Sequence, residues 1–161
     1  MQITDLETLD LSKGQEARSA EAQIAGAFDA FGAKASDPAL TALLHGEVPE
    51  AAGHRDALAE VIAAHDAAPR AHADRKMRAM LDEADRWAGA IEDAGARDAA
   101  RGASAQRGQH DEIARHCSLV ARAKPLGMRD RSRLEAIVAA EKEADARLTE
   151  IAEAGVTTEA A

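Results

Sequence analysis

Acidic and histidine residues recur at helical spacing among the apolar residues of this chain. Near the N-terminus, Glu21 stands on a stripe with Ala17 and Ile24. Further along, Glu50 precedes His54 by four residues, so both side chains lie on one helix face and can reach one ion together. The set found on such stripes is Glu21; Glu47, Glu50 and His54; Glu112 and His116; and Glu141 and Asp145. Carboxylate and imidazole together suit iron, manganese or zinc better than calcium.

These side chains are expected to meet inside a bundle of helices. Each lies near the middle of its predicted helix, and mid-helix residues of antiparallel helices meet at one height. Lone carboxylates are rarely buried, so several that converge in one core must share protons or bind cations. Such convergence is the ligand arrangement of di-metal carboxylate proteins. Because 29 residues are Asp or Glu, some fall on any stripe by chance. The prediction of a metal site therefore rests on the convergence of the helices and not on any single residue.

Four long helices and one short helix are predicted to hold these residues. Hydrophobic periodicity places the long helices at residues 6–32, 38–65, 97–124 and 129–154, and the short helix at residues 74–91. Asp37 can cap the second helix, and Pro38 can occupy its first turn. Pro49 lies inside this helix and predicts a kink or a local break. Trp87 of the short helix is expected to seal the bundle together with nearby methionines.

The third long helix has two candidate apolar stripes, which the sequence leaves open. One stripe contains Ala105, Gln109, Glu112, His116 and Leu119. The other contains Ala103, Gln106, His110, Ile113, Cys117 and Val120.

The connections predict the topology. Short turns join the first helix to the second and the third to the fourth, so each pair is antiparallel, and a long connection with its own helix joins the two pairs. This is the crossover layout of ferritin-like bundles. We therefore predict an all-α fold, a ferritin-like four-helix bundle with an extra short helix in the long crossover. It is expected to form a single domain over residues 1–161, with a frayed tail at residues 154–161.

The composition narrows the classes of function. The net charge of -9 repels phosphate backbones, so no nucleic-acid partner is expected. The N-terminal segment is neither basic nor continuously apolar, so no signal peptide is expected. No run approaches the roughly 20 apolar residues of a membrane span, so no membrane partner is expected. The single cysteine, Cys117, cannot form an internal disulfide, which suits a reducing cytoplasm.

Several segments resemble the bacterial YciE/YciF-type ferritin-like proteins. These segments are Ser19–Ile24, Ser36–Leu40, Arg97–Ala100, Gln109–Ile113, Glu141–Asp145 and Leu148–Ala152. The resemblance covers nearly the whole chain. It implies a ferritin-like bundle, a homodimer and an association with bacterial stress responses, without a defined catalysed reaction. Carried over position by position, it places the core acids of the family at Glu21, Glu50, Glu112, Glu141 and Asp145.

The chain departs from the pattern of that family at two candidate ligand positions, and tyrosines common in the family are replaced by Arg18, Asp111 and His116. Gln109 stands where the family usually has glutamate, and Glu47 stands where it usually has histidine. The change at Gln109 removes one negative ligand, for which His54 or His116 could compensate. The expected metal ligands are Glu21, Glu50, His54, Gln109, Glu112, Glu141 and Asp145. The roles of Glu47 and His116 stay open.

Two functions follow as hypotheses. The first is a ferritin-like protein that binds two divalent metal ions in the bundle core, with iron expected first and manganese or zinc as alternatives. Oxygen or peroxide chemistry in a stress response is the expected use of such a site. The alternative is a metal-free structural or interaction protein on the same scaffold. The sequence names no catalytic residue and leaves open whether the chain is an enzyme.

Overall fold

The computed structural model describes residues 2–156, and the regular structure in this range is helical. The helices are α1 (Leu6–Lys34), α2 (Pro38–Ala64), α3 (Arg75–Ala90), α4 (Ala94–Ala123) and α5 (Arg131–Ile151), followed by a π-helical turn at Ala152–Val156. The predicted helices are all confirmed, with boundaries shifted by a few residues. Residues 157–161 of the tail predicted to fray lie outside the described residues.

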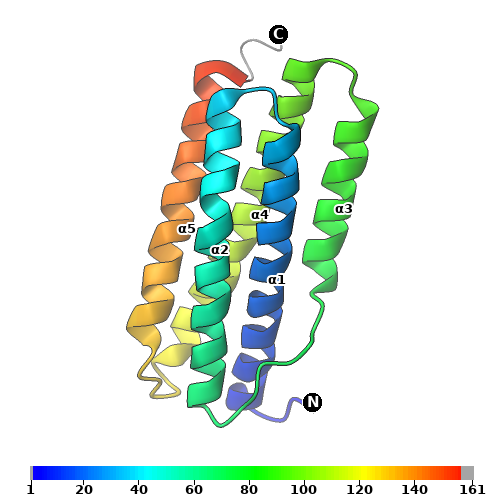
Figure 1. The fold of residues 1–161 in the computed structure, drawn as a ribbon. Coiled ribbons are helices and arrows are strands. Elements are labelled where there is room, and N and C mark those ends of the chain that lie inside the picture. The colour runs from blue at the N-terminus through cyan, green and yellow to red at the C-terminus, as the bar shows by residue number, and fades with distance from the viewer. Residues whose placement is uncertain (1, 157–161) are drawn as a thin grey trace.

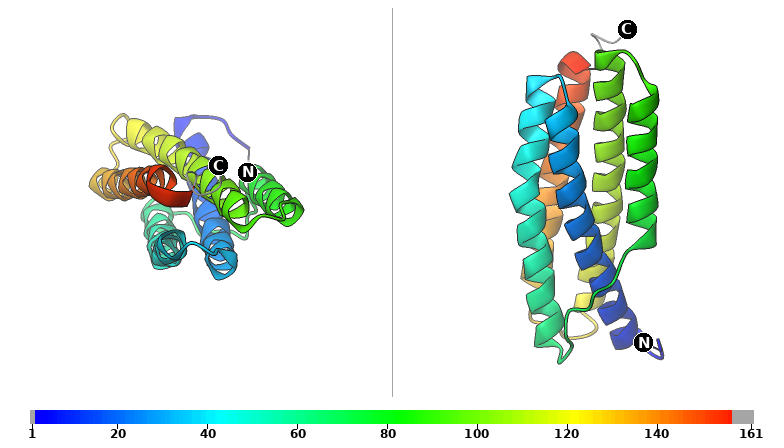
Figure 2. Two further views of the ribbon diagram at one scale, coloured as in Figure 1. Left: turned by 90° about the horizontal axis from the view of Figure 1, so that it is seen from above. Right: turned by 45° about the vertical axis from the view of Figure 1, so that its right-hand side comes forward.

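Helices α1, α2, α4 and α5 form a four-helix bundle, and α3 lies outside it against α1 and α4 (Figure 1). The chain runs up α1 and down α2, crosses to α3, and then runs down α4 and up α5. Viewed from above, α3 is set apart from the square of the other four helices (Figure 2). The all-α bundle with an additional crossover helix is therefore confirmed. Within the range described, none of the helices has the length and apolar character needed to cross a membrane.

An aspartate stands at the N-cap of each of the five helices, and four of the five side chains form a capping hydrogen bond. The side chains of Asp5, Asp37, Asp74 and Asp93 each accept a hydrogen bond from the backbone N–H three residues on, which satisfies a donor that the helix leaves free. Helix α2 continues through Pro49, so the local break expected there does not occur. The helix tolerates the loss of one backbone hydrogen bond because packing on both sides of the proline holds it.

Side chains of α1 hold the crossover segment that leads to α3. Gln15 Nε2 donates to the carbonyl of Ala68 at 2.9 Å, and its Oε1 accepts from the backbone N–H of Arg70 at 2.9 Å. One turn further on, Ser19 Oγ accepts from the backbone N–H of Asp74 at 2.9 Å. These contacts fix where α3 begins relative to α1.

Asp98, in the first turns of α4, fastens the α1–α2 turn to the bundle. Its Oδ2 accepts hydrogen bonds from the backbone N–H groups of Ser36 at 2.6 Å and Asp37 at 2.8 Å. Arg101 Nη1 donates to Asp98 Oδ1 at 3.0 Å and to the carbonyl of Lys34 at 2.8 Å. Asp98 is 1% exposed, so it has little water with which to replace these donors.

The apolar core is divided into two clusters along the bundle. One includes Ile24, Phe28, Leu40 and Leu148, and the other includes Ala17, Leu58, Leu119 and Leu134. On each of the four bundle helices, the ionisable residues of interest fall between a residue of one cluster and a residue of the other. A polar layer therefore crosses the bundle between two apolar ones.

The structure settles the register of α4. The residues Ala105, Gln109, Glu112, His116 and Leu119 are all buried, whereas the members of the competing stripe are half-buried or exposed. The stripe that carries Glu112 and His116 therefore faces the core.

Trp87 does not seal the bundle, which corrects the expectation from the sequence. Its side chain is 53% exposed, and the guanidinium of Arg86 lies 4.9 Å from the ring centroid. The residues of α3 that face the bundle are Met77, Ala84 and Ala88. Since Trp87 precedes Ala88 by one residue, about 100° of helix rotation turns it away from this face.

We expect the substitution Asp98→Ala to lower the free energy of unfolding by about 2–3 kcal/mol, because two backbone N–H groups and a buried guanidinium lose their acceptor. Urea denaturation followed by circular dichroism measures this loss. The control is Glu143→Ala, an exposed position on α5 that should change stability by less than about 0.5 kcal/mol. Equal stability of the two variants would contradict the role assigned to Asp98.

Candidate metal centre

Three buried side chains from three helices converge in the polar layer. Glu21 of α1, His116 of α4 and Glu141 of α5 each offer one ligand atom, and these atoms lie within 4.8 Å of one another. His116 Nε2 lies 3.2 Å from Glu21 Oε1. Glu21 and His116 are both 0% exposed, and Glu141 is 3% exposed. This grouping satisfies the distance requirement for a single bound ion.

Two further side chains border this group. His54 of α2 places its Nδ1 2.7 Å from Glu141 Oε1 and 3.8 Å from Glu21 Oε2. The centroids of the His54 and His116 rings are 6.5 Å apart. Glu112 of α4 is 2% exposed, and the negative charge of Glu21 contributes to raising its pKa. All four bundle helices therefore contribute to one polar layer.

Several polar atoms in this layer have no hydrogen-bond partner. With the carboxylates ionised, these atoms are both oxygens of Glu21, Oε1 of Glu112, and both ring nitrogens of His116. A buried polar atom without a partner costs about 1–3 kcal/mol, and more when it is charged. A proton held by Glu112 could be donated to Glu21 and relieve part of this cost. A cation between the carboxylates and the imidazole would satisfy more of these atoms at once, so the donor set fits a bound metal ion.

The pKa values of the buried acids are raised. Burial is the largest cause for Glu21, and the negative charge of Glu141 adds to it. Burial also raises the pKa of Glu112 well above its usual value, and the charges of Glu21 and Glu141 add to the effect. The positive charge of Arg115 lowers both pKa values, and it does not outweigh burial. The layer therefore resists holding all its carboxylates ionised without a counter-charge.

The imidazole of His116 is held neutral. Burial lowers its pKa to about 4, and the neighbouring His54 contributes to the shift. Metal ions bind the neutral form of histidine, so no proton has to leave His116 at neutral pH before an ion binds.

The structure brings together four of the seven residues proposed as ligands from the sequence: Glu21, His54, Glu112 and Glu141. It does not bring Glu50 into this group. Glu50 is exposed, and the buried face of α2 passes through Glu47, Ala51 and Leu58, with His54 half-buried beside it. The apolar stripe assumed for α2 was therefore wrong at Glu50, which lies one residue, or about 100° of rotation, before Ala51.

The other two proposed ligands lie toward the neighbouring turns. Gln109 is 2% exposed and precedes Glu112 by one turn of α4. Asp145 follows Glu141 by one turn of α5, and its Oδ1 lies 3.2 Å from His110 Nε2. Neither belongs to the group whose ligand atoms lie within 4.8 Å.

The two residues left open by the sequence have different surroundings. His116 belongs to the central group, and its position four residues after Glu112 on the buried stripe was the signal for it. Glu47 is buried and accepts a hydrogen bond from Arg147 Nη2 at 2.7 Å, so a cation of the protein already neutralises it. Burial raises the pKa of Glu47, and the charge of Arg147 opposes this effect.

The sequence and the structure were compared with known proteins. Residues 13–161 match the model of a family described as a domain of unknown function, DUF892. No curated protein matched the sequence. The structure is similar to that of the stress protein YciF from E. coli, with 25% identity, a TM-score of 0.90, and coverage of 96% of this chain and 99% of that chain.

Two other solved structures are similar. YcfI from Rhodopseudomonas palustris, described as a putative structural protein, is 31% identical with a TM-score of 0.87, and the match covers 91% of this chain and 94% of that chain. A protein from Bacillus anthracis, described among ferritin-like diiron-carboxylate proteins, is 18% identical with a TM-score of 0.73, and the match covers 92% of this chain and 99% of that chain. At that identity, the last likeness shows the fold alone, which is ferritin-like.

We expect the metal-free protein to lose stability as the pH rises above the usual carboxyl range, and Glu112→Gln to reduce this loss. A carboxyl group whose folded-state pKa is raised stabilises the fold below its unfolded pKa of about 4.3, and this contribution is lost as the pH rises through the folded pKa. Glutamine stays neutral throughout. The variant should therefore equal or exceed the wild type in free energy of unfolding at pH 8, by up to about 2 kcal/mol.

The measurement is urea denaturation between pH 5 and pH 9 after treatment with a chelator. The comparison of Glu112→Gln with the wild type isolates the carboxyl group, because His116 and the other titrating groups are common to both proteins. Glu50→Gln is the matched control, because the same chemical change occurs at an exposed position on α2. A Glu112→Gln variant with the slope of the wild type would contradict the assignment of unfavourable charge to Glu112.

Proposed function

The chain belongs to the DUF892 family of YciF-type ferritin-like proteins, and on that premise we propose that it binds divalent transition-metal ions in the core of the bundle. The observation that carries the proposal is the buried group of Glu21, His116 and Glu141, with ligand atoms within 4.8 Å of one another. These groups come from three helices and lie between two apolar clusters, where water cannot easily compensate for their charge.

The first ion would be held by Glu21, His116 and Glu141. His54 has two available roles, because its Nδ1 lies 2.7 Å from Glu141 Oε1. It can bind the ion directly, or it can donate a hydrogen bond to Glu141 and orient that carboxylate, as outer partners of metal ligands commonly do. A mixed set of carboxylates and imidazoles supports iron, manganese or zinc.

A second ion would require carboxylates from the neighbouring turns. Glu112 and Glu141 could contribute to both positions, with Glu47 and Asp145 as further donors from α2 and α5. Glu47 would first have to leave Arg147, with which it forms a 2.7 Å ion pair. Because an existing pair must be broken, we expect the second ion to bind more weakly than the first.

The burial of these side chains would limit which molecules reach a bound ion. Among the side chains of the polar layer, those of Glu21, His116 and Glu141 are at most 4% exposed, whereas that of His54 is 13% exposed. Small molecules would therefore reach the centre past His54. A bound iron or manganese ion would supply a Lewis acid and one-electron chemistry toward oxygen or peroxide. YciF from E. coli is described as a stress protein, and oxygen or peroxide chemistry in a stress response is the use that we propose here.

A metal-free scaffold is the second candidate function. The relative from Rhodopseudomonas palustris is described as a putative structural protein. In this chain Gln109 supplies no negative charge, and the raised pKa values of Glu21 and Glu112 allow protons to neutralise the layer. The two candidates differ in whether a metal ion or a set of protons balances the buried carboxylates.

We expect the chelator-treated protein to be stabilised by added Fe²⁺ under anaerobic conditions, or by Mn²⁺, Co²⁺ or Zn²⁺. An ion at 100 times its dissociation constant should raise the free energy of unfolding by about 2.7 kcal/mol. Elemental analysis after dialysis would give the number of bound ions. Glu141→Gln should weaken binding by about tenfold or more, because a charged ligand becomes neutral at nearly constant volume.

Glu50→Gln is the matched control for this experiment. It removes the same charge from an exposed carboxylate outside the central group, so metal affinity should stay within about twofold of the wild type. A protein that none of these ions binds or stabilises would support the metal-free scaffold. Equal losses of affinity in Glu50→Gln and Glu141→Gln would show that general surface charge, and not the buried group, attracts the ions.

A further inference from the structure

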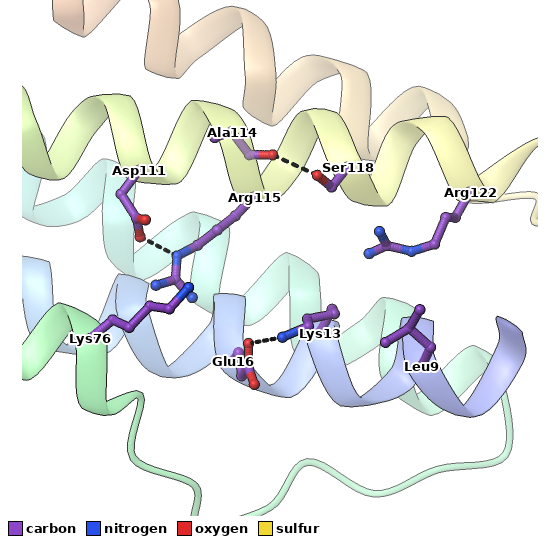
Figure 3. A pocket seen from close by; sticks show the side chains of 9 residues that line it. All are labelled: Leu9, Lys13, Glu16, Lys76, Asp111, Ala114, Arg115, Ser118 and Arg122. Carbon is purple, nitrogen blue, oxygen red and sulfur yellow. Dashed lines mark hydrogen bonds and ion pairs between the residues drawn. The ribbon is translucent and has the colours of Figure 1, made fainter. Parts of the chain in front are cut away.

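A cavity lies outside the bundle core, between α1, α4 and the start of α3 (Figure 3). Its volume is about 270 Å³. Four of its lining residues are cationic: Lys13 of α1, Lys76 of α3, and Arg115 and Arg122 of α4.

Both arginines are fixed in place by acids and still have an unused donor. Arg115 donates from Nη1 to Asp74 at 2.6 Å and from Nε to Asp111. Arg122 donates from Nε to Asp10 at 2.7 Å. The Nη2 atoms of Arg115 and Arg122 are buried and have no hydrogen-bond partner. These two nitrogens are shielded from solvent, so they do not themselves meet a molecule in the cavity. The remaining donor of Arg122 is Nη1, which makes no hydrogen bond among the described residues.

The two lysines supply mobile donors at the same cavity. Lys13 forms an ion pair with Glu16 at 2.7 Å, which leaves other N–H groups of its ammonium available. Lys76 is exposed, and among residues 2–156 its side chain has neither an ion pair nor a hydrogen bond. It stands in the first turn of α3, two residues after the N-cap Asp74, whose carboxylate accepts a backbone hydrogen bond there.

The acids near the cavity do not compete for these remaining donors. Glu16 and Asp111 line it, and each is already paired with one of the four cations, as are Asp10 and Asp74 behind the arginines. The four cations and four acids balance in charge. Selectivity would therefore come from the number and direction of the N–H groups, which arrive from three helices, rather than from net charge.

We propose that this cavity binds the phosphate group of a small molecule, with Lys13, Lys76, Arg115 and Arg122 as its donors. A phosphate has several strong acceptor oxygens in a tetrahedral arrangement, which suits donors that approach from separate directions. The cavity is larger than a phosphate ion alone, and Leu9 and Ala114 provide an apolar part of its wall. These features favour a phosphate monoester with a small organic group over free phosphate.

The test is isothermal titration calorimetry on the full chain, after a chelator has been used to remove metal ions and has itself been dialysed away. The probes are inorganic phosphate and glycerol 3-phosphate at constant ionic strength, with sodium chloride as the reference salt. We expect saturable binding of one equivalent, with the monoester bound more tightly than inorganic phosphate. If inorganic phosphate binds more tightly than glycerol 3-phosphate, the anion site is supported, but a phosphate monoester is not its ligand.

Lys76→Ala should weaken binding by about tenfold, because it removes a donor that is also one positive charge. Lys142→Ala is the matched control, since it removes the same charge from an exposed position on α5 and should leave binding unchanged. Both changes are at exposed positions, and circular dichroism would confirm that the variants keep the fold. The proposal is overturned if no saturable binding occurs, if chloride produces the same effect, or if the two variants lose affinity equally.

Discussion

The constraint on which the rest of the structure depends is the burial of several carboxylates in one layer of a helical bundle. Glu21, Glu112 and Glu141 are at most 3% exposed, and apolar clusters lie above and below them. An interior of this kind weakens the solvation of each charge and strengthens the repulsion between charges. Protons, imidazoles or metal ions must therefore balance the layer, and the four helices have to hold it in register while they do so. Whatever balances the charge of this layer therefore also determines the stability of the fold.

Much of the fold could be predicted from the sequence because its signals are local. Helix boundaries follow from aspartate caps and prolines, and the stripe of α1 through Glu21 leaves only one face for the core. Elsewhere local information was insufficient. The α2 positions Glu47, Glu50 and His54 fit one stripe by spacing, but packing against neighbouring helices turns Glu50 outward. The choice between the two stripes of α4 likewise depended on partners distant in the chain.

Arg115 links the polar layer of the bundle core to the outer cavity. Through Asp74 it ties the crossover segment to α4, and through its charge it opposes the rise in the pKa values of Glu21 and Glu112. It stands next to His116 in the chain, so the helix turns one neighbour toward the polar layer and the other toward the outer cavity. No local pattern indicates this arrangement, because Asp74 and Arg115 are 41 residues apart in the chain.

The exposure of Trp87 has an optical consequence. The chain has one tryptophan and no tyrosine, so nearly all its intrinsic near-ultraviolet emission comes from a ring on the outer surface of α3. That ring is already in contact with water, and the spectrum should therefore change little when the bundle core melts. The same ring would respond to any molecule that settles on α3, by a shift of its emission to shorter wavelength. The tryptophan fluorescence of this protein therefore reports on the surface of α3 and responds little to changes in the core.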